Sequence, residues 1–123
     1  MKAKVPHWPL TRVKELVATG QVFVQRTRAL EMFESQDAAY AAVEATIAGL
    51  TTRSFAHSTM QTQDVCDVYG IVREADGWYL KLCIDEGVPE VAIISFHLLE
   101  RPLRTNGGEI KPKTHQGSKG GGQ

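Results

Sequence analysis

The stretch from Val65 to His97, VCDVYGIVREADGWYLKLCIDEGVPEVAIISFH, decides the fold of this chain. It is dense in Val, Ile, Tyr, Trp and Phe, which favour β-structure. Turn residues divide it into three expected strands, at 65–73, 78–84 and 91–97. The Asp76-Gly77 pair predicts the first hairpin turn, because both residues tolerate a positive φ. The segment 85–89 predicts a longer second loop.

Side-chain alternation predicts how the last two of these strands pair. One face of the middle strand is apolar and carries Trp78, Leu80, Leu82 and Ile84. The register that keeps this face apolar pairs Ile84 with Ala92, Leu82 with Ile94 and Leu80 with Phe96. It also sets Lys81 opposite Ser95 and Tyr79 opposite His97. We therefore expect a phenol, an ammonium, a hydroxyl and an imidazole on one sheet face.

The segments before this stretch predict two helices and a short strand. Apolar residues at helical spacing begin at Leu10, with Thr11 as the cap and Gly20 as the stop. Residues 21–25 alternate as a strand, and residues 27–34 could form a helical turn. A second helix runs from 37 to 49, opened by Ser35 or Asp37. Residues 51–63 are polar and place His57 on a loop or an irregular strand.

These elements predict an α+β fold, in which two or three helices pack on one face of an antiparallel β-sheet. The opposite face, with Tyr79, Lys81 and His97, should stay at least partly open. After His97, apolar residues could cover an edge of the core: Leu98, Leu99, Leu103 and Ile110. The chain of 123 residues fits one domain over 1–110. A basic Gly/Lys-rich tail over 111–123 should be disordered.

Composition excludes several classes of protein and site. No run of 18 apolar residues exists, and MKAKVPHWPL has no apolar segment behind its basic residues, so we expect a cytoplasmic protein without a membrane span. Cys66 and Cys83 lack the spacing of a metal site and are expected to be reduced thiols. With no metal cluster, phosphate-binding glycine loop or serine triad in the sequence, we expect no cofactor.

A net charge of zero hides three blocks of alternating sign. Residues 1–30 carry six basic side chains against Glu15, residues 31–100 carry twelve acidic against three basic, and residues 101–123 carry five basic against Glu109. Such blocks suit a protein that meets a polyanion at one surface and a basic partner at another. Solvated faces show the same pattern.

Short pieces in a fixed order resemble a known family. They are Pro6-His7, Leu10 to Val17, Gly20-Gln21-Val22, Ile47 to Leu50, Ser54-Phe55, Asp67-Val68-Tyr69, Tyr79-Leu80-Lys81 and Ile94-Ser95-Phe96. Over residues 6–97 the set is similar to the MqsR family, the motility quorum-sensing regulator toxins. The resemblance implies a RelE-like fold and a type II toxin–antitoxin role. It further implies an endoribonuclease that cleaves mRNA without the ribosome and is held inactive by a cognate antitoxin.

Four family positions tied to activity or RNA contact map onto this chain with three departures. The tyrosine of Tyr-Leu-Lys is kept as Tyr79. A lysine two residues after a phenylalanine is replaced by His57, a glutamine before Asp-Val-Tyr by Cys66, and a lysine after Ser-Phe by His97. These departures leave the chemistry and the cleavage preference open.

The substituted set can still carry metal-independent RNA cleavage. A base takes the proton of the 2′-OH, an acid protonates the leaving 5′-oxygen, and a cation stabilises the phosphorane. Histidine serves as either acid or base near neutral pH. We hypothesise that His57 and His97 share these roles, with Tyr79 and Lys81 stabilising the phosphorane. Arg53, Arg73 and Cys66 are candidate RNA contacts.

Two other interpretations remain open at this point. A degenerate toxin could bind RNA or a regulatory partner without cutting. A small interaction domain could instead bind its partner through the basic tail. From pattern alone, Tyr79 could also be an ordinary sheet tyrosine and His97 a structural or solvated histidine at a strand end.

Overall fold

The computed structural model describes residues 3–25 and 32–112 of the chain. The three expected strands are present, and the segment around His57 is also a strand. The elements in chain order are α1 (Leu10–Ala18), β1 (Val22–Val24), α3 (Gln36–Ala48), the 3-10 turn η1 (Thr52–Ser54), β2 (Phe55–Gln61), β3 (Asp64–Arg73), β4 (Asp76–Asp85), β5 (Glu90–Leu98), β6 (Leu103–Thr105) and β7 (Gly108–Ile110).

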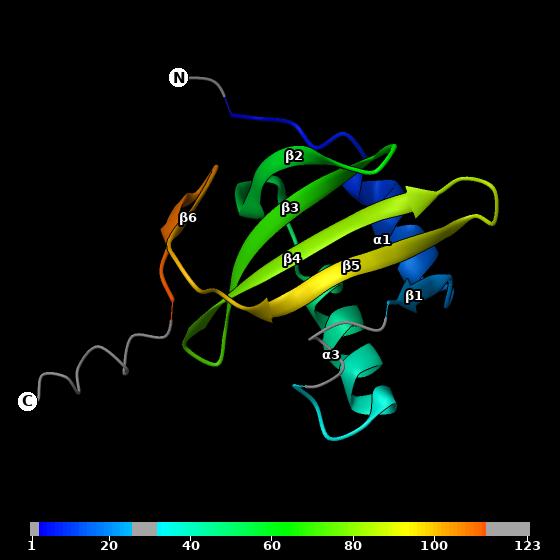
Figure 1. The fold of residues 1–123 in the computed structure, drawn as a ribbon, viewed down its shortest axis with the longest axis horizontal. Helices are drawn as coiled ribbons and strands as arrows, with labels where there is room; N and C mark the ends of the chain where they lie inside the picture. Colours follow the sequence, from blue (N-terminus) through cyan, green and yellow to red (C-terminus); the bar gives the residue numbers. More distant parts are fainter. Residues whose placement is uncertain (1–2, 26–31, 113–123) are drawn as a thin grey trace, which may run out of the picture.

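The main sheet has five strands in the order β1-β5-β4-β3-β2, and β6 and β7 form a separate two-stranded hairpin. Strands β2 to β5 pair antiparallel, whereas β1 runs parallel to β5. Helices α1 and α3 lie on one face of the sheet (Figure 1). The expected α+β class is confirmed, although β1 pairs parallel to its neighbour and the β6–β7 hairpin was not predicted. We call the face away from the helices the open face.

Local sequence explains where both helices begin. Helix α1 starts directly after Pro9, so Thr11 lies in its first turn and the predicted threonine cap is wrong. Gly20 follows the helix with φ of +84°, which agrees with the predicted stop. Helix α3 is capped by Ser35, whose hydroxyl accepts a hydrogen bond of 3.1 Å from the Ala38 amide.

The core lies between the helices and the sheet. Val13 and Val17 of α1 and Val43 and Ile47 of α3 are buried against the strands. The sheet contributes Tyr69, Trp78, Leu80, Leu82, Ile84, Val91, Ile93 and Phe96. Burying each large apolar side chain contributes about 1.5–3 kcal/mol. The core therefore fixes which face of each strand looks away from the helices.

A β-bulge in β5 corrects part of the predicted register. Lys81 lies opposite Ser95, Tyr79 opposite His97 and Leu80 opposite Phe96, as the sequence predicted. Beyond Lys81 the register shifts, so Leu82 lies opposite Ile93 and Ile84 opposite Val91. The predicted partners Ile94 and Ala92 were wrong, because one extra residue on β5 moves its first half to the other face.

A second bulge lies in β2, between Phe55 and His57. Phe55 lies opposite Tyr69 and stacks edge-on against its ring at 5.6 Å, inside the core. With Ala56 as the extra residue, His57 lies opposite Val68 and turns to the open face. Strict alternation from Phe55 would have pointed His57 toward the helices.

The first hairpin turn lies two residues earlier than predicted. Glu74 and Ala75 take the positive φ values, +50° and +74°, while Asp76 and Gly77 belong to β4. Gly77 is needed for another reason. A Cβ at this position would lie 2.2 Å from the carbonyl oxygen of Lys111 and 2.9 Å from the Leu99 side chain. The glycine permits the chain after β5 to lie directly on the sheet.

The segment before α1 is tied to the sheet by a buried carboxylate. The backbone amides of His7 and Trp8 donate to the carboxylate of Asp67, at 3.1 and 2.8 Å. Asp67 is fully buried and also accepts from the Ser58 hydroxyl at 2.6 Å. Such charge-assisted bonds are stronger than neutral ones. They hold the segment before α1 against β3.

Two expectations fall largely outside the described residues. They are the helical turn at 27–34 and the basic tail over 111–123, of which the structure describes only residues 32–34 and 111–112. In the two ranges that are described, no helix is long and apolar enough to cross a membrane.

Candidate active site on the open face of the sheet

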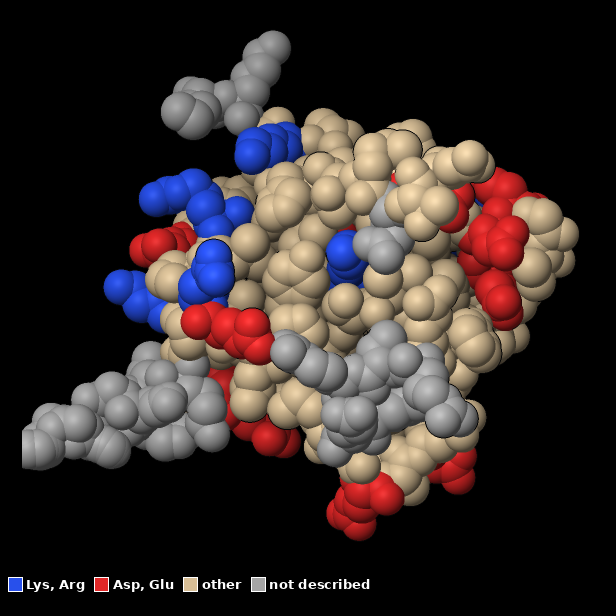
Figure 2. Space-filling view, viewed as in Figure 1, with Lys and Arg blue, Asp and Glu red and all other residues tan. Residues whose placement is uncertain are grey.

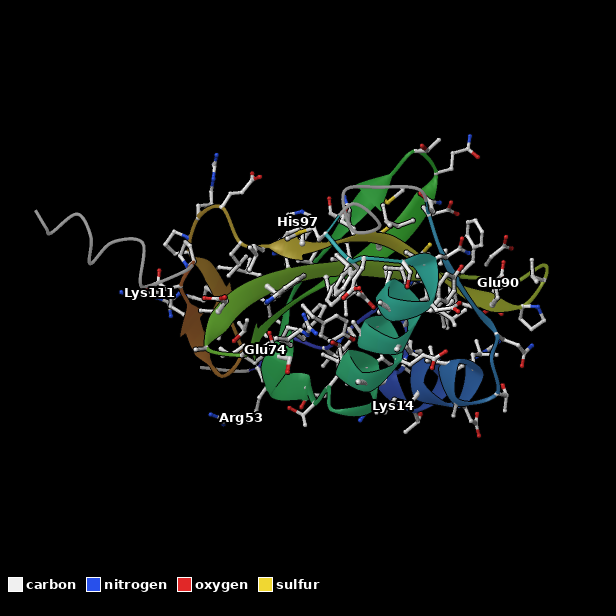
Figure 3. All side chains as sticks on the ribbon, turned by 90° about the horizontal axis from the view of Figure 1, so that it is seen from below. Lys14, Arg53, Glu74, Glu90, His97 and Lys111 are labelled. Atoms are coloured by element: carbon white, nitrogen blue, oxygen red, sulfur yellow. The ribbon has the colours of Figure 1, made fainter. Side chains whose placement is uncertain are left out.

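The strand register brings five of the seven predicted site residues onto the open face. One row across the strands runs from Gly70 to Tyr79 to His97. The next row runs from His57 through Val68 and Lys81 to Ser95. Cys66, opposite Thr59, lies in a third row. Figure 3 shows His97 on the side of the sheet away from the helices.

Tyr79 and His97 form the centre of this face. Their rings stack with centroids 5.0 Å apart and planes 10° from parallel. The stack holds the imidazole flat beside the phenol. Partial burial raises the pKa of the Tyr79 hydroxyl above its usual value, and the nearby Cys66 adds to this. Tyr79 therefore stays protonated at neutral pH and can donate a hydrogen bond.

The second contact of His97 sets its tautomer. Its Nδ1 lies 2.8 Å from the carbonyl oxygen of Leu98. Because a carbonyl oxygen only accepts, Nδ1 carries the proton in this contact. The lone pair of the neutral imidazole is then on Nε2. The ring presents a proton acceptor whose orientation is fixed both by the stack and by the backbone.

Lys81 lies in the adjacent row, two residues along β4 from Tyr79 and directly across from Ser95. Its side chain is half-buried. An ammonium and a hydroxyl thus flank the stacked pair on the same face, as predicted. Together they provide a cation, two hydrogen-bond donors and a proton acceptor within two rows of one sheet.

His57 shares the open face but does not lie next to His97. Strands β3 and β4 separate β2 from β5. With about 4.8 Å between neighbouring strands, the Cα atoms of the two histidines are at least about 14 Å apart. The side chain of His57 is exposed. This spacing argues for separate roles rather than a shared attack on one phosphodiester, and the shared acid–base role stays a prediction.

Cys66, in the third row of the open face, is fully buried, at 0% exposure. It lies within hydrogen-bonding reach of Cys83 on the neighbouring strand, and both are free cysteines. Burial raises the pKa of both thiols, that of Cys83 to about 12. Neither thiol is a nucleophile at neutral pH. A direct RNA contact by Cys66 would require it to become exposed.

The two predicted arginines lie away from this cluster. Arg73 is on the helix side, where its guanidinium carbon sits 4.5 Å from the centre of the Trp78 ring and 5.5 Å from that of Phe96. This cation–π contact covers the core. Arg53 is exposed on η1, and its carbonyl accepts from the Gly107 amide at 2.8 Å. Arg53 therefore belongs to the end of the molecule that carries β6 and β7.

Sequence reasoning predicted that the apolar residues after His97 could cover an edge of the core, but it missed that this segment borders the stacked pair. A hollow of about 290 Å³ is lined by Tyr79 and His97 on one side and by the turn after β5 on the other: Leu99, Glu100, Arg101, Pro102 and Leu103. The one signal for it was the positive charge of residues 101–123. That signal does not tell which of the basic residues meets the sheet.

A larger hollow of about 560 Å³ lies at the other end of the sheet. Its lining includes Cys66 and Cys83, but also the carboxylates of Asp64, Asp85 and Glu86. Figure 2 shows the same division. Lys and Arg gather at the end with β6, among a few acidic groups, and Asp and Glu cluster at the end with the β4–β5 loop. For a polyanionic ligand, the smaller hollow is the better placed of the two.

The described residues hold no group of three or more His, Cys, Asp or Glu side chains arranged to bind a metal ion. The face instead offers the side-chain set of an acid–base site.

None of the curated proteins is similar enough in sequence to count as a match. A sequence model of one family, described as motility quorum-sensing regulator, toxin of MqsA, matches residues 5–98. Because this match spans well over half of the chain, the protein belongs to the motility quorum-sensing regulator family, toxins of toxin–antitoxin systems whose antitoxin partner is MqsA.

Proposed function

We propose that this toxin cleaves mRNA as an endoribonuclease, by attack of a ribose 2′-OH on the adjacent phosphorus. The observation that carries the proposal is the Tyr79–His97 stack, with Nδ1 of His97 held by the Leu98 carbonyl. This arrangement leaves one oriented proton acceptor on an open sheet face. A base in that position is what activation of a 2′-OH needs.

In the proposed reaction, Nε2 of His97 takes the proton from the 2′-OH as its oxygen bonds to phosphorus. Lys81 stabilises the negative charge on the phosphorane oxygens. Tyr79, protonated at neutral pH, gives its proton to the leaving 5′-oxygen. It regains a proton from solvent after the reaction, while His97 releases the one it took. The bond from phosphorus to the 5′-oxygen then breaks. The products carry a 2′,3′-cyclic phosphate and a 5′-hydroxyl.

His57 is assigned a different part of the substrate. It lies in the same row as Lys81, two strands away on the edge strand β2. An extended RNA strand that crosses the open face from β5 to β2 would pass both. We assign His57 to a flanking phosphate or base, and Ser95, opposite Lys81, to a hydrogen bond with the phosphate at the cleaved position.

The test is cleavage of labelled RNA by the purified protein in EDTA, with product ends identified by mass spectrometry. His97→Ala should lose about 10²–10⁴-fold in rate, the usual contribution of one positioned proton carrier. The matched control is His7→Ala, which removes an exposed histidine near the buried Asp67 rather than on the open face. Equal cleavage by all three proteins would remove His97 from the mechanism.

One other result would change the functional assignment. If the folded wild type binds RNA but leaves it intact, the protein is a binding module on the toxin fold. The distance between His57 and His97 gives that alternative its physical basis, because the two cannot act together on one phosphate without rearrangement. Addition of the antitoxin provides a further control, since cleavage by the toxin should be inhibited and cleavage by a contaminant should not.

A further inference from the structure

The chain after residue 98 lies outside the family match, yet it has regular structure and packs against the rest of the domain. It makes a turn at 99–102 and then the β6–β7 hairpin. Three backbone amides of this segment donate to the body of the protein: Leu99 to Gly77, Asn106 to Phe55 and Gly107 to Arg53, at 2.8–2.9 Å. We call residues 99–110 the C-terminal extension.

The extension packs on the open face, not on an edge of the core. A Cβ on Gly70 would lie 2.9 Å from the Leu103 side chain and 3.0 Å from that of Thr105. Gly70 lies opposite Tyr79 in the row that ends at His97. The two glycines of the open face, Gly70 and Gly77, thus form the floor on which the extension rests. The neighbouring Tyr79–His97 stack is only partly covered.

This packing turns a flat sheet surface into a hollow. The turn of the extension faces Tyr79 and His97 across a space of about 290 Å³. Small-molecule sites begin at about this size. Arg101 lines the hollow and is exposed, so its guanidinium is available to a ligand that enters. Arginine binds phosphate through two parallel hydrogen bonds, which fixes both position and orientation.

We propose that the C-terminal extension forms one wall of the RNA site and that Arg101 binds a phosphate next to the cleaved bond. The inference rests on the proposed function, because it takes His97 as the reacting centre. The partner of Arg101 is the sugar–phosphate backbone, so Arg101 positions any RNA sequence equally. Glu100 lines the same hollow, and the negative charge of its carboxylate disfavours a phosphate bound next to it.

The measurement is binding of a fluorescent oligoribonucleotide whose 2′-OH groups are all methylated. Such RNA cannot be cut by 2′-OH attack, so affinity is read separately from chemistry. Fluorescence anisotropy is recorded between about 50 and 200 mM salt, the range in which phosphate contacts show their salt dependence. The variants are Arg101→Ala and Arg101→Lys. The control is Lys14→Ala, which removes the same charge from α1, on the helix side of the sheet (Figure 3).

Arg101→Ala should weaken binding roughly tenfold and lower the slope of log K against log salt by about 0.7, the value of one single-strand phosphate contact. Arg101→Lys should restore the slope but only part of the affinity, because the lysine ammonium keeps the charge and lacks the two parallel hydrogen bonds of the guanidinium. Lys14→Ala should match the wild type. An unchanged slope and affinity in Arg101→Ala would overturn the inference. Cleavage of RNA by the wild-type protein would still support the proposed function in that case. Absence of RNA binding by the folded wild type would defeat both.

Discussion

The glycine at position 77 allows a direct test of whether the C-terminal extension is held on the sheet. In the Gly77→Ala variant, the new Cβ would lie 2.2 Å from the Lys111 carbonyl oxygen, 2.9 Å from the Leu99 side chain and 3.0 Å from that of Ile110. The nearest of these atoms is backbone, which cannot rotate away. Either the extension moves off the sheet, or strand β4 is distorted.

The expected cost comes from these contacts. Overpacking of a filled site costs about 1–3 kcal/mol. Replacing glycine returns about 0.4–1 kcal/mol through the unfolded chain. The free energy of unfolding should therefore fall by about 1–2 kcal/mol. For a domain of this size that corresponds to a decrease of roughly 4–8 °C in Tm. The hollow beside His97 should widen at the same time, because Leu99 lines it.

Two measurements check this prediction. Urea unfolding gives the change in stability, and hydrogen exchange gives the protection of the Leu99, Asn106 and Gly107 amides. All three should exchange faster in Gly77→Ala. The matched control is Gly87→Ala in the β4–β5 loop, where the added Cβ meets only Asp85 Oδ1 at 3.4 Å. Wild-type stability and protection in Gly77→Ala would refute the packing of the extension on the sheet.

Three further predictions concern stability. Tyr69→Phe should stabilise the protein by about 1 kcal/mol in urea unfolding, because the Tyr69 hydroxyl is buried without a hydrogen-bond partner among the described residues; a loss of stability would mean that the hydroxyl is paired. Ala75→Gly should stabilise the protein by about 0.5–1 kcal/mol. A φ of +74° costs an alanine about 1–2 kcal/mol, and the greater conformational entropy of glycine in the unfolded chain offsets part of the gain. No gain in stability would place the strain elsewhere. Alkaline pH should destabilise the reduced protein, because the folded pKa of Cys83, about 12, is above the unfolded value of 9.0. Between these two values the folded state holds a proton that the unfolded state releases. The stability that this proton contributes is complete below pH 9 and is lost as pH rises toward 12. Cys83→Ala should therefore reduce the fall in unfolding free energy over this pH range.

The sequence predicted the elements whose apolar pattern is regular. The helix faces with Val13 and Val17 and with Val43 and Ile47 follow from helical spacing. The pairing of Leu80 with Phe96, and with it that of Tyr79 with His97, follows from strand alternation. Where the apolar pattern is regular, only one face of a helix or strand can be buried in the core.

Other features could not be read from residue types. The hairpin turn places Glu74 and Ala75 at positive φ, although Asp76 and Gly77 come directly after them and suit such a turn better. Pairing of Arg73 with Asp76 sets the turn, and the glycine is needed where Lys111 approaches the strand. That approach joins residues far apart in the sequence, so local preference gives no sign of it. The position of Arg101 beside His97 depends on the same long-range packing.

The bulges explain why both candidate histidines look away from the core. Phe55 is in the core, so strict alternation would turn His57 toward the helices; Val91 and Ile93 are in the core, so strict alternation would do the same to His97. The extra residue in each strand, Ala56 in β2 and Ile94 in β5, reverses the orientation of the side chains after it. A bulge disrupts the ladder of hydrogen bonds, and bulges are over-represented next to active sites, where they re-aim a side chain. Packing alone does not require that two separate bulges turn two histidines to the same face. Both histidines therefore share the face that carries Tyr79 and Lys81, which is the arrangement that an RNA-binding surface on that face would require.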